Sequence, residues 1–233
     1  MTKVLAPTGR GRAPARKRRK GAGAGLGLGH PVPRRVGLLG GSFNPAHPGH
    51  LHVSLEALKR LDLDEVWWLV SPQNPLKTAR GMASFAQRLE GAAQLARHPR
   101  IRVLDLEGRL GTRYTVDTLA KLERRFPHTR FVWLMGADIL IQLRRWKRWP
   151  EIFGRTAVAV FARPTYCLKA LAEIAPLRFR RHRVPPEAAR RLAGMKPPAW
   201  TFLPVRLDAN SATELRARAP RRRAAGKGSK TER

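Results

Sequence analysis

One short stretch constrains the fold of this 233-residue chain more than any other. The apolar run Arg35–Leu39 (RVGLL) has the length of a strand, and Gly40 and Gly41 follow it at once. Helical spacing begins soon after, over His50–Leu61, and the apolar run Glu65–Val70 comes next. A strand, a tight turn, a helix and a second strand in this order are typical of a parallel sheet with crossover helices.

The same alternation continues along the chain. Six apolar runs are predicted to be strands, and they cover Arg35–Leu39, Glu65–Val70, Arg102–Leu106, Phe131–Met135, Ala157–Phe161 and Thr201–Pro204. Helices are predicted over His50–Leu61, Ser84–Arg97, Val116–Phe126, Ile139–Leu143, Leu168–Ile174, Glu187–Leu192 and Thr213–Ala219. This alternation predicts an α/β fold, a Rossmann-like parallel sheet with helices on both faces. Ligands of such sheets bind beyond the carboxyl ends of the strands, so motifs directly after the strands form the candidate site.

Two basic tails flank this pattern. Residues 1–33 and 220–233 mix Gly, Pro, Ala, Arg and Lys with almost no large apolar residue, so we predict that they are disordered and leave one folded domain over 34–219. The formal net charge is +31; residues 1–35 carry ten Lys or Arg and no acid, residues 216–233 carry +7, and +14 remains between them. A basic surface favours anionic partners such as nucleotides, nucleic acid or acidic lipid headgroups. Solubility explains the tails equally well, so contact of the tails with nucleic acid stays an open alternative.

Several features favour a cytoplasmic protein. The chain has no window of about 18 uninterrupted apolar residues, so neither a membrane span nor a membrane partner is expected. Residues Gly21–His30 (GAGAGLGLGH) are too glycine-rich and too weakly apolar for a signal peptide. Cys167 is the one cysteine, which excludes an internal disulfide.

The junction after the first predicted strand has the composition of an anion site, and it reads GGSFNPAHPGHL over Gly40–Leu51. Two glycines allow a tight turn and a close approach of the backbone to a ligand. Pro48 is suited to the first turn of a helix, whose free N–H groups and positive dipole end attract anions. His47 and His50 are three residues apart across this turn, so both can reach one phosphate group as hydrogen-bond donors.

Three other interpretations explain this junction less well. A glycine turn with two surface histidines is common, but it leaves the rest of the string unexplained. A zinc site needs more ligands than two histidines, and no cluster of cysteines or carboxylates accompanies them. A Walker A loop is excluded because the sequence GxxxxGK[ST] does not occur.

The string HPGH after a glycine-rich strand end resembles the signature of the HxGH nucleotidyltransferase superfamily, which is related to class I aminoacyl-tRNA synthetases. The chain is far too short for a synthetase. The form GGSFNPAHPGHL is most similar to the bacterial nicotinate-nucleotide adenylyltransferases, and the resemblance covers about residues 35–219.

This resemblance implies an ATP site built from three stretches, of which Gly40–Leu51 is the first. Gly136-Ala137-Asp138 matches the family's adenosine site, where a carboxylate accepts hydroxyl hydrogen bonds. The stretch Ser211–Arg216 (SATELR) matches the second signature Ser-x-Ser/Thr-x-x-Arg, in which Ser211 caps a short helix and the Arg216 guanidinium meets phosphate oxygens. The implied ATP-binding residues are Gly40, Gly41, Ser42, Phe43, Gly49, Gly136, Asp138, Ser211 and Thr213.

The resemblance also implies a site for the mononucleotide that accepts the adenylyl group. Arg113–Thr118 (RYTVDT) matches a stretch that receives the nicotinate carboxylate, and Thr115 is in addition a good N-cap residue. Trp146 follows Asp138 by eight residues, the spacing at which the family stacks an indole on the pyridine ring, whereas Trp149 is predicted to lie in the core. The implied substrate-binding residues are Asn44, Lys77, Tyr114, Thr115, Trp146 and Arg163.

The reaction that the resemblance implies is transfer of AMP from ATP to nicotinate mononucleotide, which yields nicotinate adenine dinucleotide and pyrophosphate in NAD biosynthesis. Its catalytic residues are His47, His50 and Arg216, with Mg²⁺ bound through the substrate phosphates rather than by a protein metal site. Two alternatives remain. One is a sibling transferase that uses nicotinamide mononucleotide, phosphopantetheine or a CTP substrate, and the other is a basic nucleic-acid-binding protein that keeps the fold.

Overall fold

A seven-stranded sheet forms the centre of the protein in a computed structural model that describes residues 35–72, 81–162 and 166–205. The strand order is β3-β2-β1-β4-β5-β7-β6, and every neighbouring pair is parallel. The strands are β1 (Arg35–Gly41), β2 (Glu65–Val70), β3 (Ile101–Leu104), β4 (Arg130–Gly136), β5 (Ala157–Phe161), β6 (Arg183–Val184) and β7 (Trp200–Leu203). The predicted α/β fold with a parallel Rossmann-like sheet is confirmed.

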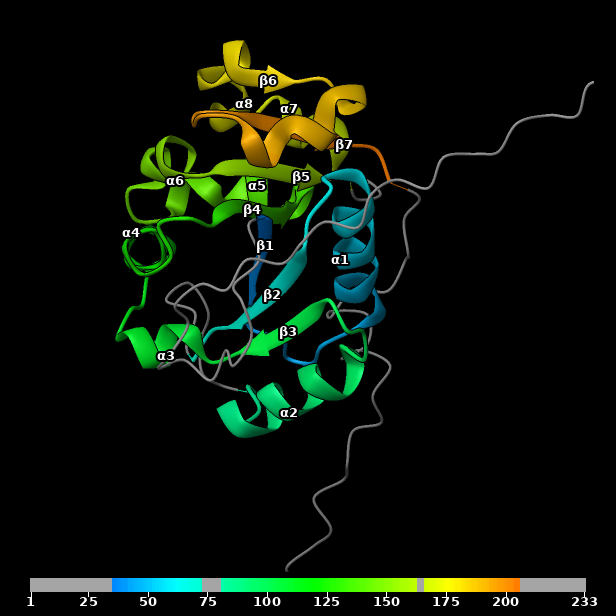
Figure 1. Ribbon diagram of the computed structural model, residues 1–233, viewed down its shortest axis with the longest axis vertical. Coiled ribbons are helices and arrows are strands. Elements are labelled where there is room, and N and C mark those ends of the chain that lie inside the picture. Colours follow the sequence, from blue (N-terminus) through cyan, green and yellow to red (C-terminus); the bar gives the residue numbers. More distant parts are fainter. Residues whose placement is uncertain (1–34, 73–80, 163–165, 206–233) are drawn as a thin grey trace, which may run out of the picture. The chain divides into compact units, whose positions relative to one another are not determined.

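Helices cover both faces of this sheet. Figure 1 shows α1 on one side of the strands, with α3, α4 and α6 on the other. The α-helices are α1 (Pro48–Arg60), α2 (Phe85–Leu95), α3 (Leu106–Leu110), α4 (Thr115–Arg125), α5 (Ala137–Gln142), α6 (Trp149–Arg155), α7 (Cys167–Leu171) and α8 (Ile174–Arg178). Three 3₁₀ segments are η1 (Leu143–Arg145), η2 (Arg180–His182) and η3 (Pro186–Gly194).

The sequence of strand β2, EVWWLV, is apolar almost throughout because both faces of the strand are buried. Trp68 belongs to the core cluster on the α1 side, together with residues of α1, α2 and η3. Trp67 points to the opposite face, where its ring meets the edges of Phe126 and Phe131 at centroid distances of 5.6 and 5.9 Å. Both tryptophans are fully buried, as expected for a parallel strand that is covered on both sides.

The six predicted strands all form, but two of them end earlier than predicted: β7 ends at Leu203, one residue before the predicted Pro204, and β3 ends two residues early. Strand β3 stops at Leu104, whereas the prediction extended to Leu106. Asp105 is the N-cap of α3, and Leu106, which is 1% exposed, buries its side chain as the first residue of that helix. The predicted helix Glu187–Leu192 is a 3₁₀ segment, and the predicted helix Leu168–Ile174 is divided, because α7 ends at Leu171 and α8 begins at Ile174. The short elements β6, α3 and α6 were not predicted because each is too brief to show a periodic pattern.

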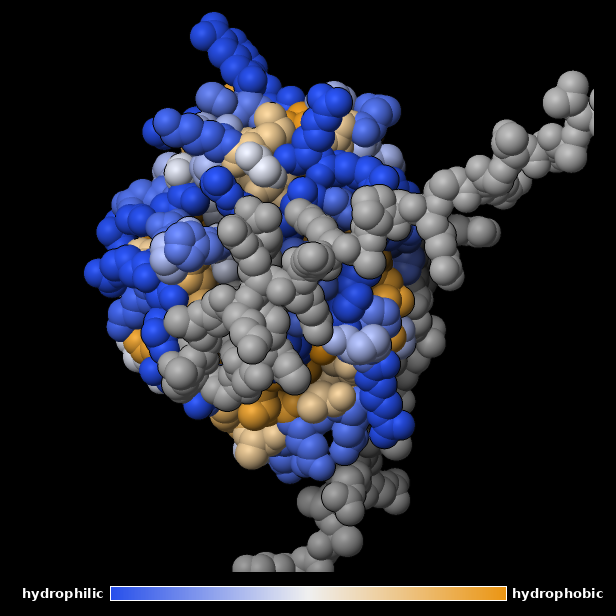
Figure 2. All heavy atoms as spheres, viewed as in Figure 1, coloured by the Kyte–Doolittle hydropathy of each residue, from blue (hydrophilic) through white to orange (hydrophobic). Residues whose placement is uncertain are grey.

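The tails lie outside the described residues, and so does the predicted helix Thr213–Ala219. The domain boundaries 1–33, 34–219 and 220–233 therefore stay predictions. Within the described part of the chain, no helix is both long and apolar enough to span a bilayer. On the face shown in Figure 2, the described residues are mostly hydrophilic, with small apolar areas, which suits the large excess of Lys and Arg.

Candidate active site

The loops that follow β1 and β2 meet at the carboxyl edge of the sheet. Gly41 at the end of β1 stands opposite Val70 at the end of β2, and the backbone N–H of Ser71 donates to the carbonyl of Gly41 at 2.9 Å. On the other side of β1, the end of β4 at Gly136 stands opposite Phe161 of β5. The sequence motifs after these strands are thus brought together at the edge where parallel sheets bind ligands.

Gly40 is required by a close approach between two strands. A Cβ atom at this position would lie 2.6 Å from Cη2 of Trp133, which is closer than real Cβ atoms come to a neighbour. Trp133 lies on β4, is 2% exposed and meets the ring of Trp146 edge-on at 6.3 Å. Glycine at position 40 therefore lets the end of β1 pack against Trp133. Trp133 in turn contacts Trp146, a predicted substrate-binding residue.

His47 and His50 lie together at the amino end of α1. Their ring centroids are 3.8 Å apart, and His47, which is 3% exposed, occupies the N-cap position directly before Pro48. The backbone N–H of His47 donates to Nδ1 of His50 at 3.2 Å. Because Nδ1 accepts this bond, a neutral His50 carries its proton on Nε2.

Two successive hydrogen bonds connect the backbone of His50 to the buried Trp68. The indole Nε1 of Trp68 donates to the hydroxyl of Ser54 at 2.7 Å, and Ser54 donates to the carbonyl of His50 at 2.8 Å. Phe43 stacks on Trp68 at 5.0 Å and lies 4.6 Å from the ring of His50. Phe43 is buried with φ at +46°, a conformation that non-glycine residues seldom adopt and that packing must hold in place.

The other loop residues occupy positions that agree with the predicted turn. Ser42 is buried, and Gly49 lies in the first turn of α1. The side-chain oxygen of Asn44 accepts a hydrogen bond from the backbone N–H of Ala83 at 3.2 Å, so Asn44 joins this loop to the segment before α2.

The predicted acceptor residues Tyr114, Thr115 and Trp146 come from two segments that touch. The Lys147 ammonium lies 4.4 Å from the ring centre of Tyr114, and Asp117 in α4 pairs with Lys147 at 3.4 Å. The start of α4 and the segment around Trp146 are therefore held side by side. The capping prediction for Thr115 is wrong: Tyr114 is the N-cap and Thr115 is the first residue of the helix.

Two further predictions concern residues after β4. Gly136 ends β4, and Asp138 lies in the first turn of α5, as the Gly-x-Asp pattern required. Trp149 does not lie in the fully buried core as predicted. It is only partly buried and meets the edges of Phe153 and Phe179, because it opens α6 at the surface of the helical layer.

Two buried ionisable residues at this edge were missed by the sequence analysis. Arg88 in α2 is 3% exposed and Glu107 in α3 is 6% exposed. Burial raises the pKa of Glu107 to about 7; a hydrogen bond from Ser71 opposes the rise, and the charge of Asp105 adds to it. Neither residue stands in a recognisable motif, and charged residues in helices usually face solvent, so no local signal pointed to them.

Five predicted residues lie outside the described residues. They are Lys77, Arg163, Ser211, Thr213 and Arg216. The part of the triphosphate site that was predicted from Ser211, Thr213 and Arg216 therefore stays a prediction.

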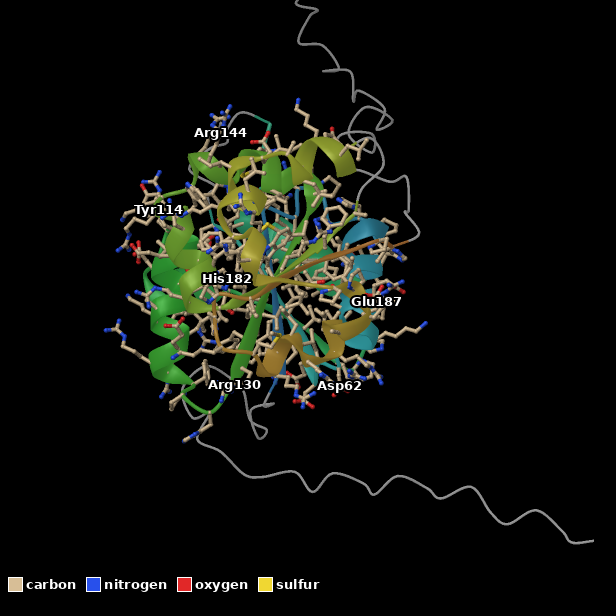
Figure 3. All side chains as sticks on the ribbon, turned by 90° about the horizontal axis from the view of Figure 1, so that it is seen from above. Asp62, Tyr114, Arg130, Arg144, His182 and Glu187 are labelled. Atoms are coloured by element: carbon tan, nitrogen blue, oxygen red, sulfur yellow. The ribbon has the colours of Figure 1, made fainter. Side chains whose placement is uncertain are left out.

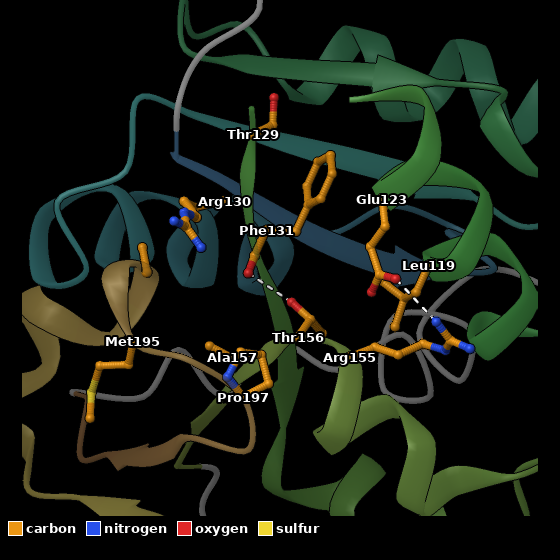
Figure 4. Close-up of a pocket in the computed structure, with 11 residues that line it drawn as sticks. Leu119, Glu123, Thr129, Arg130, Phe131, Arg155, Thr156, Ala157, Met195 and Pro197 are labelled. Atoms are coloured by element: carbon orange, nitrogen blue, oxygen red, sulfur yellow. Dashed lines mark hydrogen bonds and ion pairs between the residues drawn. The ribbon is translucent and has the colours of Figure 1, made fainter. Parts of the chain in front are cut away.

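The pocket drawn in Figure 4 lies at the opposite, amino edge of the sheet. It has a volume of about 150 Å³ and includes Arg130 and Phe131 at the start of β4 and Ala157 at the start of β5. The Thr156 hydroxyl donates to the Phe131 carbonyl at 2.7 Å beside it. None of the predicted site residues within the described ranges lines it, and Figure 3 shows Arg130 near the lower edge of the molecule, away from Tyr114 on its upper left side.

The fold and the glycine–histidine loop define a nucleotidyltransferase, and comparison with known proteins agrees. The cytidylyltransferase-like family model matches residues 38–218. A "probable nicotinate-nucleotide adenylyltransferase" of Parvibaculum lavamentivorans is 55% identical over 184 residues, which are 79% of this chain and 92% of the relative. A protein of the same name from Cereibacter sphaeroides is 52% identical, over 78% of this chain and 96% of the relative. The chain belongs to the cytidylyltransferase-like family and, within it, to the nicotinate-nucleotide adenylyltransferases.

A solved structure shares the fold. It is the Plasmodium falciparum nicotinic acid mononucleotide adenylyltransferase complexed with NaAD, with a TM-score of 0.61, 17% identity, and coverage of 79% of this chain and 83% of that one. At this identity the likeness concerns the arrangement of helices and strands.

Proposed function

We propose that this protein transfers the AMP group of ATP to the 5′-phosphate of nicotinate mononucleotide, releasing pyrophosphate and forming nicotinate adenine dinucleotide. The observation that carries the proposal is the pair His47 and His50 at the amino end of α1, beside the glycine turn of β1. Membership in the adenylyltransferase family and relatives that match over most of their length support the choice of substrates.

The chemistry needs positioning and charge stabilisation more than it needs a base. A 5′-phosphate oxygen of the mononucleotide attacks the α-phosphorus of ATP, and the bond from that phosphorus to the bridging oxygen of the β-phosphate breaks. The nucleophile is already an anion, so no proton has to be removed from it. In line with this, His47 and His50 act as hydrogen-bond donors to phosphate oxygens, and the N–H groups of the first turn of α1 add to the positive potential.

Roles for the remaining site residues follow from the same proposal. Gly136 and Asp138 hold the adenosine, and Ser211, Thr213 and Arg216 complete the phosphate site. The mononucleotide is held by Asn44, Lys77, Tyr114, Thr115, Trp146 and Arg163. The Trp146 indole stacks on the pyridinium, whose positive charge suits an aromatic face.

Mg²⁺ is proposed to enter with ATP. Among the described residues, no three His, Cys, Asp or Glu side chains gather closely enough to hold a metal ion. Mg²⁺ commonly binds phosphate oxygens and keeps several waters, so the phosphates of ATP supply a suitable site. When bound, the ion neutralises phosphate charge and favours departure of pyrophosphate. The cytoplasm is the proposed compartment, on the grounds of the single cysteine and the nucleotide substrates.

An assay of pyrophosphate release tests the proposal. The full chain is incubated with ATP and Mg²⁺ and with nicotinate mononucleotide, nicotinamide mononucleotide or phosphopantetheine, and CTP replaces ATP in a parallel series. We expect the fastest release with ATP and nicotinate mononucleotide, with nicotinate adenine dinucleotide identified by mass spectrometry. A faster reaction with another pair would assign a sibling transferase, and no release with any pair would favour a binding protein that keeps the fold.

A further inference from the structure

Arg88 is a buried cation. Among the described residues, its guanidinium forms hydrogen bonds only to backbone carbonyl oxygens. Its Nη1 donates to the carbonyls of Ser42 at 2.7 Å and Ser71 at 2.8 Å. Its Nη2 donates to the carbonyl of Pro72 at 2.7 Å, and its Nε donates to that of Ala83 at 3.1 Å. One side chain thus makes four hydrogen bonds to three separate stretches of backbone.

Two of these stretches belong to the loops of the candidate active site. Ser42 directly follows β1, in the loop that leads to the histidines, and Ser71 and Pro72 directly follow β2. The two loops are also joined by the hydrogen bond from the Ser71 N–H to the Gly41 carbonyl. Arg88 therefore links the loop after β1 to the loop after β2 through a side chain that is almost completely buried.

The environment of Arg88 is costly for a charge. Burial lowers the pKa of its guanidinium from the ordinary value, and among the described residues no carboxylate lies within the 4.0 Å of an ion pair. Buried charges are normally paired with an opposite charge, and departures from this rule concentrate at functional sites. The planar guanidinium has five N–H donors in fixed directions, which makes it suited to holding several carbonyls in one geometry.

The bond to Ser42 also determines where a neighbouring N–H points. The peptide between Ser42 and Phe43 is trans, so its C=O and its N–H point in opposite directions. Because Arg88 holds the C=O on the buried side, the N–H of Phe43 is turned away from Arg88. This N–H lies in the loop in which phosphate contacts are proposed.

We propose that Arg88 is a positioning residue for adenylyl transfer: it sets the Ser42–Phe43 peptide and locks the loop after β1 to the loop after β2. The expected effect on catalysis rests on the proposed function, whereas the expected effect on the two loops rests on the contacts alone. Arg88 touches no reacting atom; it acts through the backbone that it holds.

Three variants of the full chain test this role. Arg88→Ala removes all four hydrogen bonds, and Arg88→Lys keeps the charge but cannot reproduce the fork of donors. Arg97→Ala is the matched control, since Arg97 is an exposed arginine just beyond the same helix. Activity is measured below the thermal midpoint of each variant, and circular dichroism verifies that each is folded.

We expect kcat/KM to fall about 10- to 100-fold for both substrates in Arg88→Ala, because a small displacement of positioning groups has effects of this size. Arg88→Lys should show a smaller loss with near-normal thermal stability, and Arg97→Ala should match the wild type. Added guanidinium at millimolar concentration should restore part of the activity of Arg88→Ala.

Hydrogen–deuterium exchange gives a readout that needs no substrate. In Arg88→Ala, exchange should rise in peptides that contain residues 41–47 and 70–72, while the central strands keep their protection. Arg88 variants that fold and show wild-type kinetics and wild-type exchange would overturn the proposal. A uniform rise in exchange, or loss of folding in both Arg88 variants, would also overturn it, since Arg88 would then stabilise the fold as a whole. A wild-type protein that releases no pyrophosphate would instead refute the proposed function, and the exchange data would still decide the role of Arg88 in the loops.

Discussion

The two ends of the β-sheet hold their charged side chains in different ways. At the carboxyl end, Arg88 and Glu107 are almost completely buried, and both contact the loop after β2. At the amino end, Arg35 pairs with Asp62, whose side chain is 53% exposed. The buried groups have fixed partners and little access to water, whereas the exposed pair is screened by solvent.

This difference teaches where sequence changes should matter. A buried charge or hydrogen bond that loses its partner costs several times more than an exposed ion pair, because water cannot replace the lost contact. The carboxyl end should therefore respond strongly to single substitutions in both activity and stability. The amino end, where Arg155 and Glu123 also form a half-exposed pair at 3.1 Å, should tolerate them.

The largest effect is expected from His50→Ala. Loss of one donor to a developing phosphate charge typically lowers kcat by about 100- to 1,000-fold, and the KM for ATP should change far less because other groups still bind the phosphates. Steady-state pyrophosphate release measures both constants. His128→Ala, at an exposed histidine just before β4, is the control and should behave as the wild type. A His50→Ala enzyme with normal kcat would remove His50 from the mechanism.

Glu107 should make the stability of the protein depend on pH. Its pKa of about 7 lies above the ordinary value of 4.5, so between these two pH values the folded protein holds a proton that the unfolded chain has lost. The free energy of unfolding should therefore fall as pH rises through this window, by up to about 3 kcal/mol, and then level off.

Glu107→Gln should remove this contribution, since the amide stays neutral. Urea unfolding at pH 5 and pH 8 should show that the variant gains stability relative to the wild type as pH rises. Glu187→Gln, at an exposed glutamate, is the control. Parallel pH profiles for Glu107→Gln and the wild type would show that the buried carboxyl does not titrate in this window.

Gly40→Ala tests the close approach of β1 to Trp133. The added methyl would meet Cη2 of the indole at 2.6 Å, so the ring or the strand must move, and overpacking of this kind costs about 1–3 kcal/mol. Activity should fall as well, because the displaced backbone leads into the histidine loop. Gly154→Ala is the matched control: its Cβ would meet nothing within 4 Å, and in α6 it should raise helix stability slightly. Equal stability of Gly40→Ala and the wild type would contradict the steric argument.

The fold and the histidine loop could be predicted because their signals are local. An apolar run followed by two glycines and a helix start specifies strand, turn and anion site within about 16 residues, from Arg35 to His50. The support beneath the loop could not be predicted. Arg88 and Glu107 are polar residues on helices, and only the packing of α2 and α3 against distant loops buries them. The capping role of Thr115 was wrong by one position, since the helix begins at Thr115 itself, one residue earlier than a capping threonine requires.

The smallest effect is expected at the amino end, from Asp62→Asn. The substitution removes the charge that pairs with Arg35, and exposed ion pairs of this kind contribute about 0–1 kcal/mol. Asp62 has φ at +50°, in the left-handed region, and asparagine accepts that conformation as readily as aspartate does. Loss of the pair is therefore the main change. Thermal and urea unfolding should place the variant within about 1 kcal/mol of the wild type, with unchanged kcat, and 0.5 M salt should narrow the difference further. A loss of stability as large as that of Gly40→Ala would mean that the amino end depends on its charges as the carboxyl end does.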